Sequence, residues 1–577
     1  MTAITPTKET YSLLAIDLGT VYTRVFLFDM VEGQYSFIAS GSAPNTMKKP
    51  YCDINEGLHR AFTQLEEKTG RGIIDSQAKL LYPSTHEGMG VDRLVLTYSA
   101  GPEIRMILVG LLSEVSLESL RIVANSVYGT VVDSIGVGDG RSVDEQIDTV
   151  LRLSPQIIVF AGGMEQGASR SVLKMAELVS LILKVLPEEK RPEVLYCGNS
   201  QLAQRIKEGL EHWTPVATAK NIRPSLDDET FMDSQALLSQ MVLYQKSKKI
   251  QGLEDLSQIC STEPESTAMG FHRIIRYLGT ESKIQRAVLG VDLGASHATM
   301  AIADRSQSIV DVFDLGLGTS MSNIIRKAGL DAVYEWISAD IPPSVVLDYI
   351  WQKKLQPGQI PASTIALEIE QAVARVALRL MIQHLQQRWP QEKANFDPIL
   401  VSGAVFGNVP HPSDSLMMVL DGIQPMGITT ITLDTNGITG PLGTAAKIHP
   451  AIPVQALESG AFLNLGTVIC PISSERNGKP VLRIRYETED GQTDDIQVRK
   501  GTIIQIPISQ GKTARIMVSG IGRTIVDPVV GKGLAAFKTV GGVCGLVIDA
   551  RGRNIALPTA VEERRELLHL WRTTLKG

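Results

Sequence analysis

Two patterns of hydrophobic and polar positions divide the chain near residue 450. Before that point, short runs of consecutive apolar residues alternate with longer segments in which apolar residues recur every three or four positions. Such runs are typical of buried strands and such segments of amphipathic helices, so the pattern predicts an α/β architecture. The strands expected are residues 13–16, 25–28, 94–96, 157–160 and 398–401, and the helices are 173–186, 201–210, 231–244 and 364–388.

After residue 450, polar residues alternate with apolar or β-branched ones, as in strands with one buried face. Two turn signals, Asp490-Gly491 and Gly511-Lys512, interrupt the alternation. The last segment, residues 560–575, has the spacing of an amphipathic helix. The pattern therefore predicts a small antiparallel β-domain that ends in a helix. The strands expected here are residues 481–488, 496–498, 502–508 and 513–518.

One stretch of the chain occurs twice. Leu-Leu-Ala-Ile-Asp-Leu-Gly-Thr at residues 13–20 matches Val-Leu-Gly-Val-Asp-Leu-Gly-Ala at residues 288–295, and a second apolar run follows each copy. A constant offset over two consecutive strands predicts a duplicated lobe rather than two chance turns. The offset is 275 residues for Asp17 and Asp292, for Gly19 and Gly294, and for Asp29 and Asp304.

At 577 residues the chain is too long for a single hydrophobic core. A polar segment of weak periodicity, residues 251–267, is expected to connect the first lobe to the second Asp-Leu-Gly turn. The expected organisation is a flexible N-terminus at 1–10, a first lobe at 11–285, a second lobe at 286–450, and a β-rich C-terminal domain with its terminal helix at 451–577.

Composition and charge narrow the function classes. Hydrophobic residues make up 44% of the chain and charged residues 20%, which is typical of a globular protein, and a net charge of −6 does not favour a nucleic-acid surface. The five cysteines show no CxxC spacing, which argues against a disulfide framework or a zinc cluster and favours a reducing compartment. Neither a signal-peptide pattern nor a stretch of the roughly 20 apolar residues of a membrane span is present. We expect a cytoplasmic protein without nucleic-acid or membrane partners.

The repeated turns carry the candidate chemistry. A strand that brings a carboxylate into a tight Gly turn places an acid and backbone N–H groups at one point, and two such points facing each other would hold a magnesium polyphosphate. Asp17 and Asp292 are the candidate residues for holding Mg²⁺. They are expected to contact the water ligands of the ion, because Mg²⁺ loses water reluctantly. The candidate nucleotide-binding residues are Asp17, Gly19, Thr20 and Thr23 in the first turn, Asp292, Gly294, Ala295 and Ser296 in the second, and Ser402, Gly403 and Ala404 in a later Gly-containing turn beside the adenosine.

This three-part pattern resembles the actin, Hsp70 and sugar-kinase superfamily of two-lobed ATPases. The resemblance implies an α/β fold of two ribonuclease H-like lobes, in which paired Asp-x-Gly hairpins flank ATP or ADP and Mg²⁺. Other segments are similar to those of the glutamate mutase L family, which is abbreviated MutL and is unrelated to the mismatch-repair protein. They are Thr-Tyr-Ser-Ala-Gly at 97–101, Arg-Met-Ile-Leu-Val-Gly at 105–110, Ile-Ile-Val-Phe-Ala-Gly-Gly at 157–163, Gly-Asn at 198–199 and Asp-Leu-Gly at 314–316.

The family resemblance covers most of residues 11–450. It implies an ATP-binding, chaperone-like accessory protein that maintains or reactivates an adenosylcobalamin-dependent mutase, its protein client. Two alternatives share the fold, since a fold does not fix a function: a small-molecule kinase, and a nucleotide-binding scaffold or filament subunit with impaired hydrolysis. The residue that orients the attacking water stays open among Asp133, Asp139 and Glu165.

The second turn departs from the family pattern, which is Asp-Ile-Gly-Gly followed by a small residue, two threonines and an acid. Here Ala295 replaces the second Gly, His297 and Ala298 stand at the threonine positions, and Thr299 stands at the acid. The lost hydroxyls and carboxylate predict slow or absent hydrolysis with nucleotide binding retained, unless Ser296 and Thr299 compensate. A lone His near a turn, such as His297, is more often a structural hydrogen-bonding residue than a phosphate donor.

Two other Gly-containing segments give weaker signals. Residues 511–513 lack the strand, Gly-rich loop and helix of a P-loop, so a hairpin turn is expected there. Residues 314–320 lack the last Gly of a dinucleotide fingerprint. Two interpretations stay open: the segment covers the nucleotide or the second lobe, or it is only a Gly-rich connection from a strand to a helix. Without an HExxH motif or paired Cys/His spacing, the sequence does not favour a zinc enzyme.

Overall fold

The computed structural model describes residues 11–85, 87–167, 169–281, 286–389, 395–528, 531 and 533–575. The flexible N-terminus predicted at residues 1–10 lies outside these residues. The chain forms two compact units. Unit 1 consists of Met1–Gly270, Val310–Val312 and Gly440–Ile452, and unit 2 consists of Phe271–Ile309, Phe313–Thr439 and Pro453–Gly577.

The first sheet of unit 1 is built on the N-terminal hairpin. Strand β1 pairs antiparallel with β2 and parallel with β4, in the order β10-β4-β1-β2-β3. Helix α1 (Asn55–Thr69) packs closely on this sheet because Gly41 has no side chain; a Cβ there would clash with the carbonyl oxygen of Ala61. The strands are β1 (Leu13–Leu18), β2 (Tyr22–Val31), β3 (Gln34–Pro44), β4 (Arg93–Tyr98) and β10 (Glu265–Ser266).

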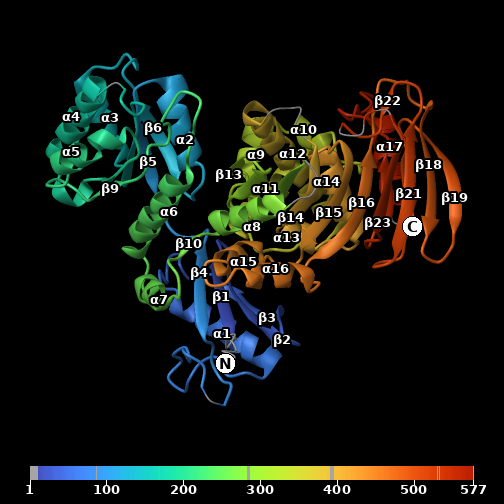
Figure 1. Cartoon of the computed structure of the whole chain (residues 1–577), viewed down its shortest axis with the longest axis horizontal. Helices are drawn as coiled ribbons and strands as arrows, with labels where there is room; N and C mark the ends of the chain where they lie inside the picture. The colour runs from blue at the N-terminus through green and yellow to red at the C-terminus, as the bar shows by residue number, and fades with distance from the viewer. Residues whose placement is uncertain are drawn as a thin grey trace, which may run out of the picture. The chain divides into compact units, whose positions relative to one another are not determined.

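A second sheet of unit 1 is entirely parallel, with the order β6-β5-β7-β8-β9. Its strands are β5 (Arg105–Val109), β6 (Thr130–Ile135), β7 (Ile157–Phe160), β8 (Glu193–Tyr196) and β9 (Val216–Thr218). Its core contains side chains of α4 and α5, and Figure 1 shows the helices around it. The helices of this part of the chain are α2 (Glu118–Ala124), α3 (Val143–Leu153), α4 (Ser169–Val185), α5 (Ser200–Leu210), α6 (Met232–Ser247) and α7 (Leu253–Ile259).

The main sheet of unit 2 has eight strands in the order β13-β12-β11-β14-β15-β16-β24-β20. Strand β11 pairs antiparallel with β12 and parallel with β14, which in turn pairs parallel with β15. Unit 1 pairs β1, β2, β4 and β10 in the same manner, so the predicted duplicated α/β fold is confirmed. The strands are β11 (Ala287–Leu293), β12 (Ala298–Ala303), β13 (Ser308–Phe313), β14 (Phe396–Ser402), β15 (Gly427–Asp434), β16 (Leu463–Cys470), β20 (Ile503–Ile506) and β24 (Leu546–Asp549).

The longest helix, α12 (Thr364–Arg388), begins and ends at the residues that the sequence pattern predicts. Most of its residues from Ile369 to Leu385 are buried in the core of unit 2, which explains its weak amphipathicity. The other helices from Thr267 to the end of the described chain are α8 (Thr267–Glu281), α9 (Met321–Ala328), α10 (Asp331–Tyr334), α11 (Pro343–Leu355), α13 (Ala404–Gly407), α14 (Pro412–Gly422), α15 (Thr439–Ala445), α16 (Ala451–Glu458) and α17 (Val561–Thr574).

Three of the strands predicted after residue 450, at 481–488, 496–498 and 513–518, lie in a four-stranded antiparallel sheet, β19-β18-β21-β23. The strand predicted at 502–508 is β20 of the main sheet instead. The buried face of the four-stranded sheet packs with β20 and β24, so these strands share one core. The Asp490-Gly491 hairpin is confirmed, but the hairpin predicted at Gly511-Lys512 is wrong, because that turn joins strands of two different sheets. The remaining strands are β17 (Ile472–Ser473), β18 (Pro480–Thr488), β19 (Thr493–Arg499), β21 (Thr513–Gly520), β22 (Thr524–Ile525) and β23 (Ala535–Val540).

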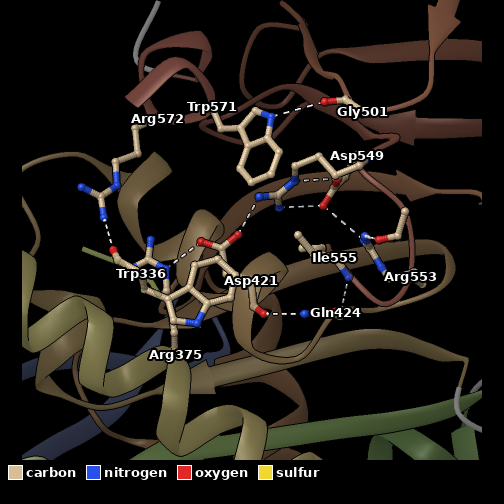
Figure 2. A network of polar contacts seen from close by, with 12 residues as sticks. Trp336, Arg375, Asp421, Gln424, Gly501, Asp549, Arg553, Ile555, Trp571 and Arg572 are labelled. Carbon is tan, nitrogen blue, oxygen red and sulfur yellow. Dashed lines mark hydrogen bonds and ion pairs between the residues drawn. The ribbon is translucent and has the colours of Figure 1, made fainter. Parts of the chain in front are cut away.

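A buried ionic network joins the C-terminal segment to the rest of unit 2 (Figure 2). Asp421 of α14 accepts hydrogen bonds from Arg375 Nε of α12 at 2.6 Å and from Arg551 Nη1 at 2.7 Å. Arg551 also binds Asp549 at the end of β24, at 2.9 Å. The guanidinium of Arg551 lies 4.7 Å from the ring centroid of Trp571 on α17. The network thus connects α12, α14, β24 and the terminal helix.

The predicted connector at residues 251–267 is largely regular structure. It contains α7 and β10, and its last residue, Thr267, is the first residue of α8. Two residues of β10 pair with β4 and complete the first sheet of unit 1. A strand this short gives no periodic signal, which is why the sequence pattern shows only a polar segment. Among the helices of the described residues, none is both long enough and apolar enough to cross a membrane.

Candidate functional site

The turn after β1 is a tight hairpin that requires glycine. Gly19 N donates to the carbonyl oxygen of Tyr22 at 3.0 Å, and a Cβ at Gly19 would lie 2.9 Å from that oxygen. Thr20 and Val21 lie at the tip and are half-buried. Asp17 stands on β1 just before the turn, so its carboxylate and the turn backbone belong to one short segment.

Asp17 is buried, and two threonines hold it. Thr97 Oγ1 of β4 donates to Asp17 Oδ1 at 2.8 Å, and Thr267 Oγ1 donates to the same oxygen at 2.7 Å. Burial raises the pKa of Asp17 above its usual value, and the charge of Arg24 and both hydroxyls oppose that rise. Thr267 begins α8, and a helix N-terminus stabilises a nearby negative charge. The Asp17 carboxylate is therefore fixed in direction by groups far apart in the sequence.

Thr23 lies on the other face of the hairpin from Asp17. In the β1–β2 register, Thr23 pairs with Leu18 whereas Asp17 pairs with Arg24, and neighbouring positions of a strand point to opposite faces. Thr23 Oγ1 is buried beneath α1, 3.4 Å from where a Cβ at Gly57 would lie. In the described structure, that hydroxyl lies between the hairpin and α1, away from the tip of the turn.

The turn after β11 repeats this geometry in unit 2. Gly294 N donates to the carbonyl oxygen of His297 at 3.0 Å, and a Cβ at Gly294 would lie 2.8 Å from that oxygen. Asp292 pairs with Thr299 across the hairpin, as Asp17 pairs with Arg24. The sequence repeat therefore corresponds to two hairpins of the same register and the same turn.

Residues 314–320 pack directly on the second turn. Leu317 N donates to Gly294 O at 2.9 Å, and Gly318 N donates to Ala295 O at 2.8 Å. A Cβ at Gly318 would lie 3.0 Å from the Cβ of Ala295, so the extra methyl group of Ala295 fits against a glycine. The hydroxyl of Ser296 hydrogen-bonds with that of Thr319. This segment therefore supports the second turn from one side.

The third candidate segment lies beside the second turn. Ser402 ends β14 and is the parallel partner of Asp292 on β11. Gly403 follows with φ 119°, and a Cβ there would clash with the carbonyl oxygen of Leu293. Ala404 then begins α13. Unit 2 thus brings together Asp292, Gly294, Ala295, Ser296, Ser402, Gly403 and Ala404.

Each unit also places a second acid two strands away from the first. Thr97 lies between Asp17 and Glu265 in the register of unit 1, and Ser402 lies between Asp292 and Asp434 in unit 2. Glu265 binds Lys447 Nζ at 2.7 Å, and Asp434 accepts hydrogen bonds from the backbone of residues 436–439. Neither acid is predicted by the sequence pattern, because neither stands beside a glycine.

A buried lysine braces the first turn. Lys246 Nζ of α6 donates to Ala100 O at 2.7 Å, and Ala100 N donates to Leu18 O at 3.0 Å. The ammonium group lies 5.3 Å from the ring centroid of Tyr98. Burial lowers the pKa of Lys246 to about 7. The only sequence signal for this residue is a lysine at a core-facing position of a helix.

The three acids considered for orienting water belong to the parallel sheet of unit 1. Asp133 and Asp139 form ion pairs with Arg141 at 2.6 and 2.8 Å. Glu165 accepts hydrogen bonds from Ser200 Oγ at 2.5 Å and from Asn221 Nδ2 at 2.8 Å. These partners give each acid a structural role where it stands, Asp133 on β6, and Asp139 and Glu165 on the loops after β6 and β7.

The residues around Asp17 are compatible with a metal bound through water. Among the described residues, no group of three or more His, Cys, Asp or Glu side chains converges as direct metal ligands would. Asp17 Oδ1 already accepts two hydroxyls, which leaves Oδ2 as the oxygen for a water of Mg²⁺. Mg²⁺ commonly keeps several waters and needs only one or two carboxylates. The donor set fits such outer-sphere binding.

Comparison with known proteins identifies a family. The family model described as MutL protein matches residues 13–460. No curated protein matches the chain. Solved structures with similar folds include a diol dehydratase-reactivating factor in nucleotide-free form, with 11% identity, coverage of 78% of this chain and 99% of that one, and a TM-score of 0.29. A glycerol dehydratase reactivase has 11% identity, 71% and 94% coverage and a TM-score of 0.27. Xylulose kinase from Bifidobacterium adolescentis has 11% identity, 77% and 92% coverage and a TM-score of 0.27.

Proposed function

The chain belongs to the MutL protein family, and from this premise we propose that it is an ATP-binding accessory protein that reactivates an adenosylcobalamin-dependent mutase. The observation that carries the nucleotide-binding part is the repeated hairpin. Gly19 and Gly294 make the same turn, with an acid two residues before each. The family carries the part that concerns the client, since it supports a mutase-related role.

The proposal gives each hairpin the same task. Backbone N–H groups at a turn of this kind stabilise phosphate oxygens, and the Thr20 hydroxyl adds a donor at the tip. Asp17 and Asp292 hold water ligands of Mg²⁺, which neutralises phosphate charge when it is bound. Gly403 lets the backbone approach the adenosine. Because Thr23 lies beneath α1, we assign it to support of the hairpin rather than to contact with phosphate.

The second turn argues for binding with little hydrolysis. Ala295 and Ala298 supply no hydroxyl, and the Ser296 hydroxyl is engaged with Thr319. Thr299 is buried opposite Asp292. Few donors therefore remain to stabilise the charge that develops on a transferred phosphoryl group. We propose that ATP acts mainly by selecting one conformation of the chain, which binds the client differently from the nucleotide-free protein.

Calorimetry with Mg²⁺ and ATP tests the nucleotide site. Asp17→Asn and Asp292→Asn each remove one carboxylate charge and should weaken binding by about 1–3 kcal/mol, or roughly 5-fold to 150-fold. Asp148→Asn changes an exposed acid of α3 and serves as the matched control, with binding unchanged. One ATP per chain weakened by both variants supports a shared nucleotide. Wild-type affinity in both variants would refute the assignment.

An activity assay tests the role. The mutase is first inactivated by turnover, and activity is then followed after addition of this protein, ATP, Mg²⁺ and fresh adenosylcobalamin. Recovery that requires ATP and is lost with Asp17→Asn is the expected result. If nucleotide binds but no activity returns, the reactivating role is wrong. ADP production that depends on an added metabolite would instead identify a small-molecule kinase.

A further inference from the structure

The parallel sheet of unit 1 contributes no residue to the proposed nucleotide site. From β5 the chain passes to β6 on one side of the sheet, and the next strand, β7, lies on the other side of β5. Open parallel sheets commonly bind ligands at the carboxyl ends of the two strands that flank such a switch point, here β5 and β7. Here that position is filled. The side chain of Leu111 lies 2.8 Å from where a Cβ at Gly162 would stand, and a Cβ at Gly198 would lie 2.6 Å from Gly162 N. The loops pack on one another where a small ligand would otherwise bind.

The same edge exposes four large apolar side chains. They lie on the loops that follow β5, β6, β7 and β9, and we call them the apolar edge. Exposed apolar groups gathered at one place mark interaction sites more often than chance surface positions. The members and their exposed fractions are Leu112 (59%), Val137 (62%), Met164 (37%) and Leu226 (64%).

Hydrogen bonds join these loops into one surface. Val137 N donates to Leu111 O at 3.1 Å, which links the loops after β6 and β5. Glu165 N donates to Pro224 O at 3.0 Å, which links the loops after β7 and β9. The contact between Leu111 and Gly162 connects the two pairs. The apolar edge is therefore held by a continuous set of loops from four parallel strands.

Negative charge surrounds the apolar edge. Glu114 is exposed in the short π-helix Ser113–Leu117 that follows Leu112, and Asp227 and Asp228 are exposed on the loop after β9. Two arginines of these loops are already neutralised, since Arg141 pairs with Asp133 and Asp139 and Arg223 pairs with Glu229. Lys220 on the loop after β9 and Arg170 in the first turn of α4 are also exposed, but the exposed acids outnumber them. More acids stand in the first turns of the adjoining helices, namely Glu118, Asp144 and Glu145. A complementary partner would present apolar side chains surrounded by lysine and arginine.

We propose that the apolar edge is the surface on which the client mutase docks, through a patch of the mutase that combines apolar side chains with basic ones. This inference rests on the proposed function and names the part of the chain that recognises the client. Apolar side chains at the centre of an interface supply most of its affinity, and surrounding charges of opposite sign steer the encounter. Binding should therefore weaken as salt rises.

The test uses the full chain and purified glutamate mutase from the same organism. The variant Leu112→Ser with Met164→Ser removes two members of the apolar edge without touching the buried core. The control is Leu181→Ser with Val185→Ser, which changes two comparably exposed apolar residues of α4. Interferometry should show mutase binding weakened by roughly tenfold or more in the edge variant and unchanged in the control. Raising the salt from about 50 to about 300 mM should weaken wild-type binding.

Parallel measurements separate the failures. Calorimetry with Mg²⁺ and ATP should give wild-type nucleotide affinity for both double variants. If the mutase binds the edge variant as well as it binds wild type, the docking surface is wrong and the proposed function stands. If the mutase does not bind wild type at all, both are wrong. Two other outcomes would also overturn the proposal. If mutase binding is unchanged and the edge variant alone loses self-association, the apolar edge binds a second copy of the chain. If mutase binding is unchanged and the edge variant alone loses binding to phosphatidylcholine vesicles, the apolar edge binds a lipid surface.

Discussion

Removing one charge from the network of Figure 2 should cost unit 2 a large share of its stability. The variant Asp421→Asn keeps the size and shape of the side chain but leaves one carbonyl oxygen in place of a carboxylate. That carboxylate is buried and serves Arg375 at 2.6 Å and Arg551 at 2.7 Å. The amide NH₂ of asparagine would then face one of two guanidinium groups.

The structure sets the magnitude. Arg551 keeps Asp549 as a second partner at 2.9 Å, but Arg375 is fully buried and forms its ion pair with Asp421. Burial lowers the pKa of Arg375, and Asp421 is the group that opposes this effect most. Leaving such a charge unpaired costs about 3–5 kcal/mol. Replacing the pair by apolar side chains, as in Arg375→Met with Asp421→Leu, should recover part of that loss.

Urea unfolding followed by tryptophan fluorescence is a suitable assay, because Trp336, Trp351, Trp389 and Trp571 lie in unit 2 and only Trp213 in unit 1. Asp495→Asn is the matched control. Asp495 makes a bidentate pair with Arg483 on the exposed face of β18 and β19, where water screens the charges, so its loss should hardly move the urea midpoint. Equal midpoints for Asp421→Asn and Asp495→Asn would refute the argument that burial decides the value of an ion pair here.

Three further outcomes are expected. Lys246→Met should remove a pH dependence of stability. Burial lowers the pKa of Lys246 in the folded protein to about 7 from its ordinary value of 10.5, so the wild-type free energy of unfolding should rise by about 1 kcal/mol for each pH unit above 7. Urea midpoints at two pH values would show this. Burial lowers the pKa of His272 to about 4 from 6.5, so stability is full above pH 6.5 and should fall by about 2–3 kcal/mol towards pH 4.5; thermal melts of His272→Phe should lack this loss. Gly403→Ala should weaken ATP binding in calorimetry, because its Cβ would displace the backbone beside Gly294, whereas Gly209→Ala, with open space around it on α5, should bind as wild type does.

The local features of the site could be predicted from the sequence. Asp17-Leu-Gly and Asp292-Leu-Gly each follow an apolar run, and the structure places both in hairpins with one register. The long helix and the antiparallel strands after residue 450 were also predictable, since their patterns repeat over many residues. Family membership, expected from short motifs, is confirmed over residues 13–460.

Other features depend on contacts that no local pattern records. Thr267 lies 250 residues from Asp17 and yet donates a hydrogen bond to it. Strands β16, β20 and β24 extend the sheet of unit 2, although their spacing fits an independent β-domain equally well. Lys246 resembles any other helical lysine until its burial beside Ala100 is seen.

Local sequence is enough to place the turns and the acids that stand before them, because turn geometry and strand periodicity are set by a few neighbouring residues. Which strands lie side by side, which polar groups fix Asp17 and Asp421, and which apolar side chains stay exposed on the loops after β5, β6, β7 and β9 follow from the folded chain alone. Those outcomes depend on parallel pairing and burial between segments far apart in the chain, and no short window of residues contains both partners.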